Sequence, residues 1–202
     1  FCEMDKIFFC DSGSIAIEVA MKIAWQYHIN NQDFERKKFI SFKNSYHGDT
    51  TGARSLADLN EGMHKKFSNL LINNYCLDLP NNNENIINLE NFIKTHQQEI
   101  AGIFIEPLVQ CAGGMKFHST KTLENIFKIA NKYDILTIAD ECATGFYRTS
   151  KKFAFMHTQY KPDILTIGKA LTGGFVTLSA TLTSNKIFNK FLDNSCGSGI
   201  TG

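Results

Sequence analysis

Four stretches of this sequence place chemically useful side chains directly after apolar runs. They are "DSGS" (11–14), "SYHGDT" (45–50), the end of "ILTIAD" (135–140) and "TIGKALTGG" (166–174). Asp140 is costly at the buried end of a strand unless a cation or strong donors accompany it. Gly13 permits close backbone approach before a helix start, where free N–H groups suit a phosphate, and Tyr46 suits stacking on a planar ring. Together with Lys169, these residues predict a small-molecule site.

Each stretch also has a structural interpretation, which is favoured when the stretch is taken alone. Ser12 or Ser14 would only cap the helix, and Tyr46 would wedge between a loop and the core. His47 would be a satisfied structural histidine, and Lys169 an exposed turn lysine. The combination of the four stretches favours the functional interpretation instead.

Two nucleotide-binding interpretations lack their main part. In an ATPase, Asp140 would serve magnesium and Glu141 a water, but that chemistry needs a G-x-x-x-x-G-K-[ST] loop. The candidate Gly-Lys, at 168–169, is followed by Ala170 and comes after the acid rather than before it. A nicotinamide enzyme is a weak interpretation, because "DSGSIA" does not match G-x-G-x-x-G.

Pyridoxal 5'-phosphate is the ligand that would use all four stretches. Its phosphate would lie on Gly13, Ser14 and the helix start, its ring on Tyr46, its ring nitrogen at Asp140 and its aldehyde on Lys169. A carboxylate beside the pyridine nitrogen favours the protonated ring, which draws electrons from the substrate α-carbon. Lys169 would form the Schiff base, be displaced by the substrate amine and then move the proton. The sequence therefore predicts Lys169 as the catalytic residue and no metal site.

The elements that must position these residues are strands and helices in alternation. Strand-like runs cover 6–10, 38–42, 101–109, 135–140, 163–170 and 177–184, and helical patterns cover 14–28, a region near 89–98, and 121–134. This order predicts an α/β fold with a mainly parallel sheet flanked by helices, with the Asn-rich stretch 79–91 as a surface connection. Ala16, Ala20 and Ala24 recur every four residues and predict a helix face that lies close against the sheet.

Composition narrows the classes of partner. The 202 residues, 43% of them hydrophobic, predict one globular domain. A net charge of +1 does not favour nucleic acid or an anionic membrane as a partner. Glu106 and Asp140 interrupt or end the most apolar stretches before they reach the roughly 20 residues of a membrane helix. The scattered cysteines contain no CxxC pair, so we expect a reducing, cytoplasmic setting.

With these residues in view, the chain resembles the class III pyridoxal-phosphate aminotransferases. That family is marked by "GS-x-A-x-E-x-A-x-K-x-A", "YHG" and "DE-x-x-T-G-F", with a lysine farther along. This sequence has "GSIAIEVAMKIA" (13–24), "YHGDT" (46–50), "DECATGF" (140–146) and then Lys169. Within the family, "IEPLVQCAGGM" (105–115) and Ala143 are similar to the members that act in biotin biosynthesis.

The resemblance implies a fold, a reaction and further site residues. It implies the type I fold of pyridoxal-phosphate transferases and a homodimer with the active site between subunits. It implies amino transfer from S-adenosylmethionine to 8-amino-7-oxononanoate in two half-reactions on one cofactor. By the same likeness Tyr46 and Lys169 border the substrate, Arg148 faces it, and Asp49 lies close by. Another class III aminotransferase, acting on an ω-amino acid or a diamine, is the first alternative.

The chain also departs from the family pattern. Tyr147 and Ser150 stand where the family usually has glycines, so we expect the loop that carries Arg148 to be strained or moved. The chain ends in "DNSCGSGITG" (193–202), where the family continues with a His-Gly-Pro-Thr stretch. By the resemblance, residues 1–202 form the central part of the large cofactor-binding domain, without the N-terminal segment and the C-terminal small domain. We therefore expect this chain alone to be weakly active or inactive, and a non-catalytic remnant is the second alternative.

Overall fold

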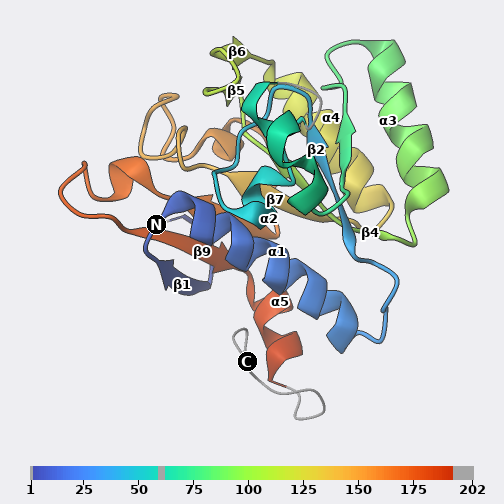
Figure 1. The fold of residues 1–202 in the computed structure, drawn as a ribbon, viewed down its shortest axis with the longest axis horizontal. Helices are drawn as coiled ribbons and strands as arrows, with labels where there is room; N and C mark the ends of the chain where they lie inside the picture. Colours follow the sequence, from blue (N-terminus) through green and yellow to red (C-terminus); the bar gives the residue numbers. More distant parts are fainter. Residues whose placement is uncertain (1, 59–61, 193–202) are drawn as a thin grey trace.

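A seven-stranded sheet forms the centre of the computed structural model, which describes residues 2–58 and 62–192 (Figure 1). In spatial order its strands are β1 (Lys6–Cys10), β9 (Ser179–Thr183), β8 (Ile164–Ile167), β7 (Leu136–Asp140), β4 (Ile100–Ile105), β2 (Lys38–Phe42) and β3 (Tyr75–Leu77). The pairs from β8 to β3 are parallel, whereas β9 is antiparallel to both β8 and β1. The expected mainly parallel sheet is confirmed.

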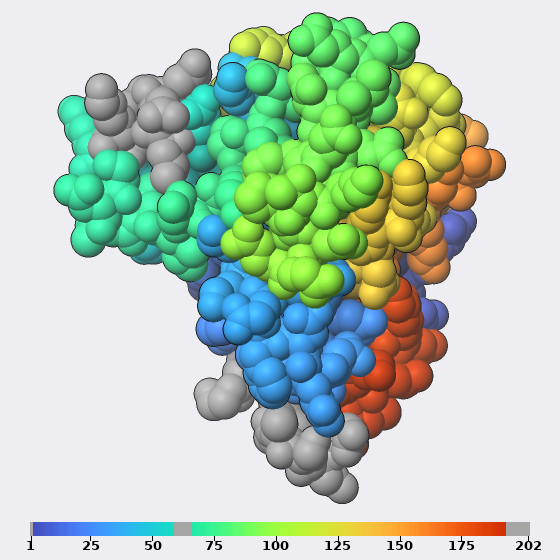
Figure 2. All heavy atoms as spheres, turned by 90° about the vertical axis from the view of Figure 1, so that its right-hand side faces the viewer, coloured from blue at the N-terminus to red at the C-terminus, as the bar shows by residue number. Residues whose placement is uncertain are grey.

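Helices cover both faces of the sheet and divide the core in two. Helix α1 (Gly13–Asn30) packs on one face, against β8 and β9. Helices α3 (Asn83–His96) and α4 (Thr120–Lys132) pack on the other. Figure 2 shows α3, in green, spread over that side of the molecule, with α4 in yellow beside it. This layering explains why β4, β7 and β8 consist wholly of buried residues.

The alanine face predicted for α1 is confirmed. Ala16, Ala20 and Ala24 are fully buried, and the Thr181 hydroxyl of β9 donates to the carbonyl oxygen of Ala16 over 2.6 Å. Ser12 caps the helix, because its hydroxyl accepts from the Ile15 amide at 3.4 Å. The small side chains therefore hold the first turn of α1 close to the sheet.

Two predicted element boundaries are wrong by four residues or more. The helix expected near 89–98 begins at Asn83, because the Asn82 side chain accepts from the Asn85 amide at 2.8 Å and caps it. The strand expected over 101–109 ends at Ile105. Leu108 then has a left-handed φ of 67°, and the chain enters a small hairpin of β5 (Val109–Gln110) and β6 (Lys116–Phe117).

Short elements complete the described part of the chain. They are α2 (Thr51–Arg54), α5 (Asn185–Phe188), and four 3-10 turns, η1 (Gly62–Leu70), η2 (Ala154–His157), η3 (Lys169–Leu171) and η4 (Asn189–Phe191). Within residues 2–58 and 62–192, no helix combines the length and apolar character that a membrane crossing needs. The predicted departure at 193–202 and Cys196 lie outside the described residues.

Candidate active site

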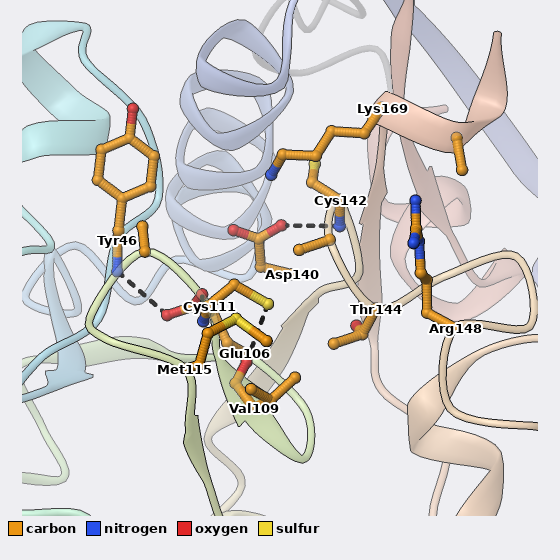
Figure 3. Close-up of a pocket in the computed structure, with 13 residues that line it drawn as sticks. Tyr46, Glu106, Val109, Cys111, Met115, Asp140, Cys142, Thr144, Arg148 and Lys169 are labelled. Carbon is orange, nitrogen blue, oxygen red and sulfur yellow. Dashed lines mark hydrogen bonds between the residues drawn. The ribbon is translucent and has the colours of Figure 1, made fainter. Parts of the chain in front are cut away.

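Two adjoining hollows lie where β4, β7 and β8 end. The larger has a volume of about 480 Å³ and the smaller about 190 Å³. Four residues line both hollows, and Figure 3 shows them around one space: Tyr46, Asp140, Cys142 and Lys169. Gly13 and Ser14 line the smaller hollow, and Arg148 lines the larger one. The structure thus brings six of the seven predicted site residues together.

Asp140 ends β7 with its carboxylate fully engaged. One oxygen lies 2.8 Å from His47 Nδ1, and the other accepts from the Cys142 amide and the Thr166 hydroxyl, each at 3.1 Å. Burial alone raises the pKa of Asp140, but the hydrogen bond and charge of His47 outweigh it and lower the pKa. Asp140 is therefore held ionised at the border of both hollows.

His47 is the partner that the sequence interpretation missed. The structural role favoured for His47 is incomplete, because its fully buried side chain also contacts the Asp140 carboxylate. Burial lowers the pKa of His47, but the hydrogen bond and charge of Asp140 raise it more, so the pKa is raised overall. The need of a buried aspartate for a cation was the available signal, and "YHG" supplied a histidine after another strand of the same sheet.

Tyr46 is held at both ends. Its amide donates to Glu106 Oε2 at 3.1 Å, and its hydroxyl donates to Asp49 Oδ2 at 2.8 Å. Burial and the Asp49 hydrogen bond raise the pKa of Tyr46 to about 12, so the phenol stays neutral. Asp49 itself lines neither hollow, and Arg54 contacts its other oxygen at 3.2 Å. Asp49 therefore contacts the Tyr46 hydroxyl without lining either hollow.

Close backbone packing joins this loop to α1. A Cβ at Gly48, whose φ is +130°, would lie 2.8 Å from the Cα of Ser14. The Ser14 hydroxyl accepts from the Asp49 amide at 3.0 Å, and Glu18 accepts from the Gly52 amide at 2.7 Å. The motif residues Ser14 and Glu18 thus position the loop that carries Tyr46.

Glu106 is a site residue that the sequence interpretation left without a role. It is 5% exposed, lines the larger hollow, and accepts from the Cys111 amide at 3.3 Å as well as from Tyr46. Burial raises its pKa to about 7, against the lowering effect of His47. Its position directly after a buried strand, like that of Asp140, was the signal for its placement.

Lys169 opens η3, separated from β8 by Gly168, and its side chain extends into the space bordered by Tyr46 and Asp140 (Figure 3). Its φ of 40° is left-handed, an uncommon conformation for a residue other than glycine. Cys142 forms the wall beside it, because a Cβ at either Gly13 or Gly168 would lie 3.4 Å from the Cys142 Sγ. The Lys169 backbone is thus strained, and its side chain enters the hollows beside Cys142.

The Arg148 loop has the strain expected from its sequence. Tyr147 and Ser150 each have a φ of 69°, and Phe146 has a φ of 60°. Left-handed φ values cost non-glycine residues about 1–2 kcal/mol each. Arg148 nevertheless lines the larger hollow, on the side of Thr144 and across from Tyr46 (Figure 3).

Comparisons with known proteins point to one family. The aminotransferase class-III family model matches residues 1–202. The chain is 41% identical to the adenosylmethionine-8-amino-7-oxononanoate aminotransferase of Staphylococcus aureus, over 95% of this chain and 46% of that protein. It is 40% identical to the Helicobacter pylori protein of the same name, over 93% and 44%. The chain thus spans about half the length of the curated relatives it matches.

Solved structures agree with these matches. The adenosylmethionine-8-amino-7-oxononanoate aminotransferase of Methanocaldococcus jannaschii has a TM-score of 0.88 and 38% identity, over 94% of this chain and 44% of that one. A PLP-bound amine transaminase from an uncultivated Pseudomonas species has a TM-score of 0.86 and 31% identity, over 93% and 45%. The family model, the sequence identities and the fold agree, and this chain belongs to the class III aminotransferases.

Proposed function

We propose that the chain carries the cofactor site of a pyridoxal-phosphate-dependent enzyme that transfers an amino group from S-adenosylmethionine to 8-amino-7-oxononanoate, in biotin biosynthesis. One observation carries the proposal: the Lys169 amine, the Tyr46 ring and an aspartate held ionised by His47 border one space at the strand ends. The names of the relatives support the choice of donor and acceptor.

The residues of the two hollows fit the parts of this cofactor. The smaller hollow offers Gly13, Ser14 and the first turn of α1 to a phosphate. Tyr46 offers a neutral ring for stacking, and Asp140 offers a negative charge to a protonated ring nitrogen. When bound, the cofactor supplies an electron sink for the carbon that bears the amino group.

Lys169 would perform the proton transfers. Its Nζ would take the proton from the amine-bearing carbon of the donor and later return a proton to the acceptor at C7. Asp140 stays ionised during these steps because His47 and two further donors hold its carboxylate. Arg148 and Lys169 are the basic residues of the larger hollow, so Arg148 suits a substrate carboxylate. Asp49 would act through its hydrogen bond to the Tyr46 hydroxyl.

A homodimer is part of the same proposal. Large apolar side chains are exposed on segments that adjoin or line the hollows, among them Met115, Phe117, Phe175 and Val176. Large exposed apolar side chains can belong to interaction surfaces, and a second copy of the protein would cover them. Light scattering on the complete protein should then give twice the mass of one of its chains.

Borohydride trapping tests the cofactor proposal. The chain is mixed with pyridoxal phosphate, reduced, digested and mapped by mass spectrometry. We expect a pyridoxyl group on Lys169, no label there in Lys169→Ala, and undiminished label on Lys169 in Lys161→Ala, in which an exposed lysine is removed instead. Label spread over exposed lysines, or no label, would contradict the proposal and favour a non-catalytic remnant.

A second candidate is a class III aminotransferase that uses another amine. The 0.86 TM-score with an amine transaminase favours keeping it. Absorbance of the bound cofactor, followed after addition of S-adenosylmethionine, β-alanine or putrescine, separates the two. Conversion with S-adenosylmethionine alone supports the first proposal, and conversion with β-alanine or putrescine alone supports the second.

A further inference from the structure

Glu141 is a buried acid with no place in the chemistry described above. It follows Asp140 directly, is fully buried and does not line either hollow. Its backbone is fixed to the sheet, because its amide donates to the Thr166 carbonyl oxygen at 2.9 Å. Burial raises the pKa of Glu141 to about 7, against the lowering effect of its hydrogen bonds. A group buried at such cost requires a structural reason.

The Glu141 carboxylate joins the two ends of one loop. Its Oε2 accepts from the Thr144 hydroxyl, and its Oε1 accepts from the Phe155 amide at 2.8 Å. The Glu141 carbonyl oxygen accepts from the Gly145 amide at 2.9 Å. The segment between these contacts, residues 145–154, is the loop that presents Arg148 to the larger hollow.

This loop would not keep its conformation unaided. Phe146, Tyr147 and Ser150 all have left-handed φ values, which are unfavourable for these residue types. Such strain persists only where surrounding contacts over-determine the conformation. Inside the loop, the Tyr147 amide donates to the Lys152 carbonyl oxygen at 3.2 Å, and Phe146 packs edge-on against the buried Phe153. The Glu141 contacts tie both loop ends to the sheet, and His157 Nε2 contacts the Thr149 carbonyl oxygen inside the loop at 2.6 Å.

We propose that Glu141 is a positioning residue that clamps the two ends of the 145–154 loop and thereby fixes Arg148 at the larger hollow. The clamp itself rests on the geometry of the loop. The proposed function enters only in the statement that Arg148 meets a substrate carboxylate there.

Limited proteolysis reads the clamp directly, because trypsin cleaves after Arg148. In Glu141→Leu the Phe155 amide and the Thr144 hydroxyl lose their acceptor, while the buried charge is also removed. We expect cleavage after Arg148 in the folded chain to become about tenfold faster. In the unmodified chain, opening the loop breaks the hydrogen bonds to the Glu141 carboxylate, whereas the variant has none to break. Glu141→Gln should restore protection, since its amide oxygen accepts from Phe155 and its amide nitrogen donates to the Thr144 hydroxyl.

Asp163 provides a matched control. Its Oδ2 accepts from the amide and the hydroxyl of Thr137, at 2.9 and 3.0 Å, at the other end of β8. Asp163→Leu should lower the melting temperature without exposing Arg148. If Glu141→Leu does not fold, Thr144→Val takes its place, with a several-fold rise in cleavage expected.

Two results would overturn the proposal. One is cleavage after Arg148 that rises no more in Glu141→Leu, or in Thr144→Val if Glu141→Leu does not fold, than in Asp163→Leu. The other is a Glu141→Gln chain that is cleaved as fast as Glu141→Leu. A chain that follows the expected cleavage pattern but takes no pyridoxyl label on Lys169 would contradict the proposed function and leave the clamp established.

Discussion

Gly48→Ala offers a quantitative test of how the Tyr46 loop meets α1. The new Cβ would lie 2.8 Å from the Ser14 Cα, a backbone atom at the start of a helix, and the residue has a φ of +130°. The left-handed conformation costs about 1–2 kcal/mol for a residue with a Cβ. The overlap adds about 1–3 kcal/mol, because neither backbone can move without disturbing the sheet contacts. Gly48→Ala should therefore destabilise the fold by about 2–5 kcal/mol.

Gly114→Ala separates these two contributions. Gly114 has a φ of +102°, but a Cβ there meets only the end of the Lys116 side chain, at 4.0 Å. It therefore incurs the conformational cost without the overlap. For a chain of this size about 1 kcal/mol shifts the thermal midpoint by about 2–4 °C, so we expect a loss of about 5 °C for Gly114→Ala and about 10 °C for Gly48→Ala.

Thermal unfolding followed by far-UV circular dichroism gives the midpoints. Borohydride trapping measures how much pyridoxyl label Lys169 still takes up. Gly48→Ala should also reduce the pyridoxyl label on Lys169, because the clash displaces Ser14 and the Tyr46 loop together. Gly114→Ala should keep the label. Equal losses of thermal midpoint in the two variants would refute the inference that the loop and the helix are in close backbone contact.

Three further changes have expected outcomes. Tyr147→Gly relieves a φ of 69° and should raise the thermal midpoint by about 1–4 °C. The gain of about 1–2 kcal/mol from relieving the strain exceeds the entropic cost of ordering a glycine. A lower midpoint would contradict the inference that Tyr147 is strained. Burial and the nearby Asp140 charge raise the pKa of Cys142 well above its usual value, so iodoacetamide at pH 8 should alkylate it far more slowly in the folded chain than in urea. Hydrogen bonds, first from His96, lower the pKa of Glu99 to about 2, so Glu99→Gln should lower the urea midpoint at pH 6. The difference in urea midpoint between the two chains should fade between pH 4.5 and about 2. A difference that stays constant with pH would exclude this linkage.

The strands and α1 were predictable because their signals are local. Continuous apolar runs marked β7 and β8, and alanines at every fourth residue marked the buried face of α1. The start of α3 was misplaced because the Asn82 cap lies in a stretch whose composition resembles a loop. Capping depends on one side-chain torsion, which composition does not encode.

The site was predictable only as far as strand ends reveal it. Asp140 ends β7 and Lys169 follows the neighbouring parallel strand β8, so the topology brings them to one edge of the sheet. The contact of His47 with Asp140 joins segments that are far apart in the sequence. The contact of Glu106 with the Tyr46 amide does the same, so neither could be predicted without the fold. Sequence patterns indicated which side chains approach the hollow, but not which of them contact one another.

The pairing of β1 with β9 has a consequence for the order of folding. Lys6 pairs with Thr183, far along the chain, so the β1 ladder cannot form until β9 has been synthesised. Packing of α1 on the sheet is delayed as well, because its main partner strands are β8 and β9. Such distant pairings slow folding and leave apolar surface uncovered during synthesis. The part of the smaller hollow that is built on the first turn of α1 is therefore expected to be completed late.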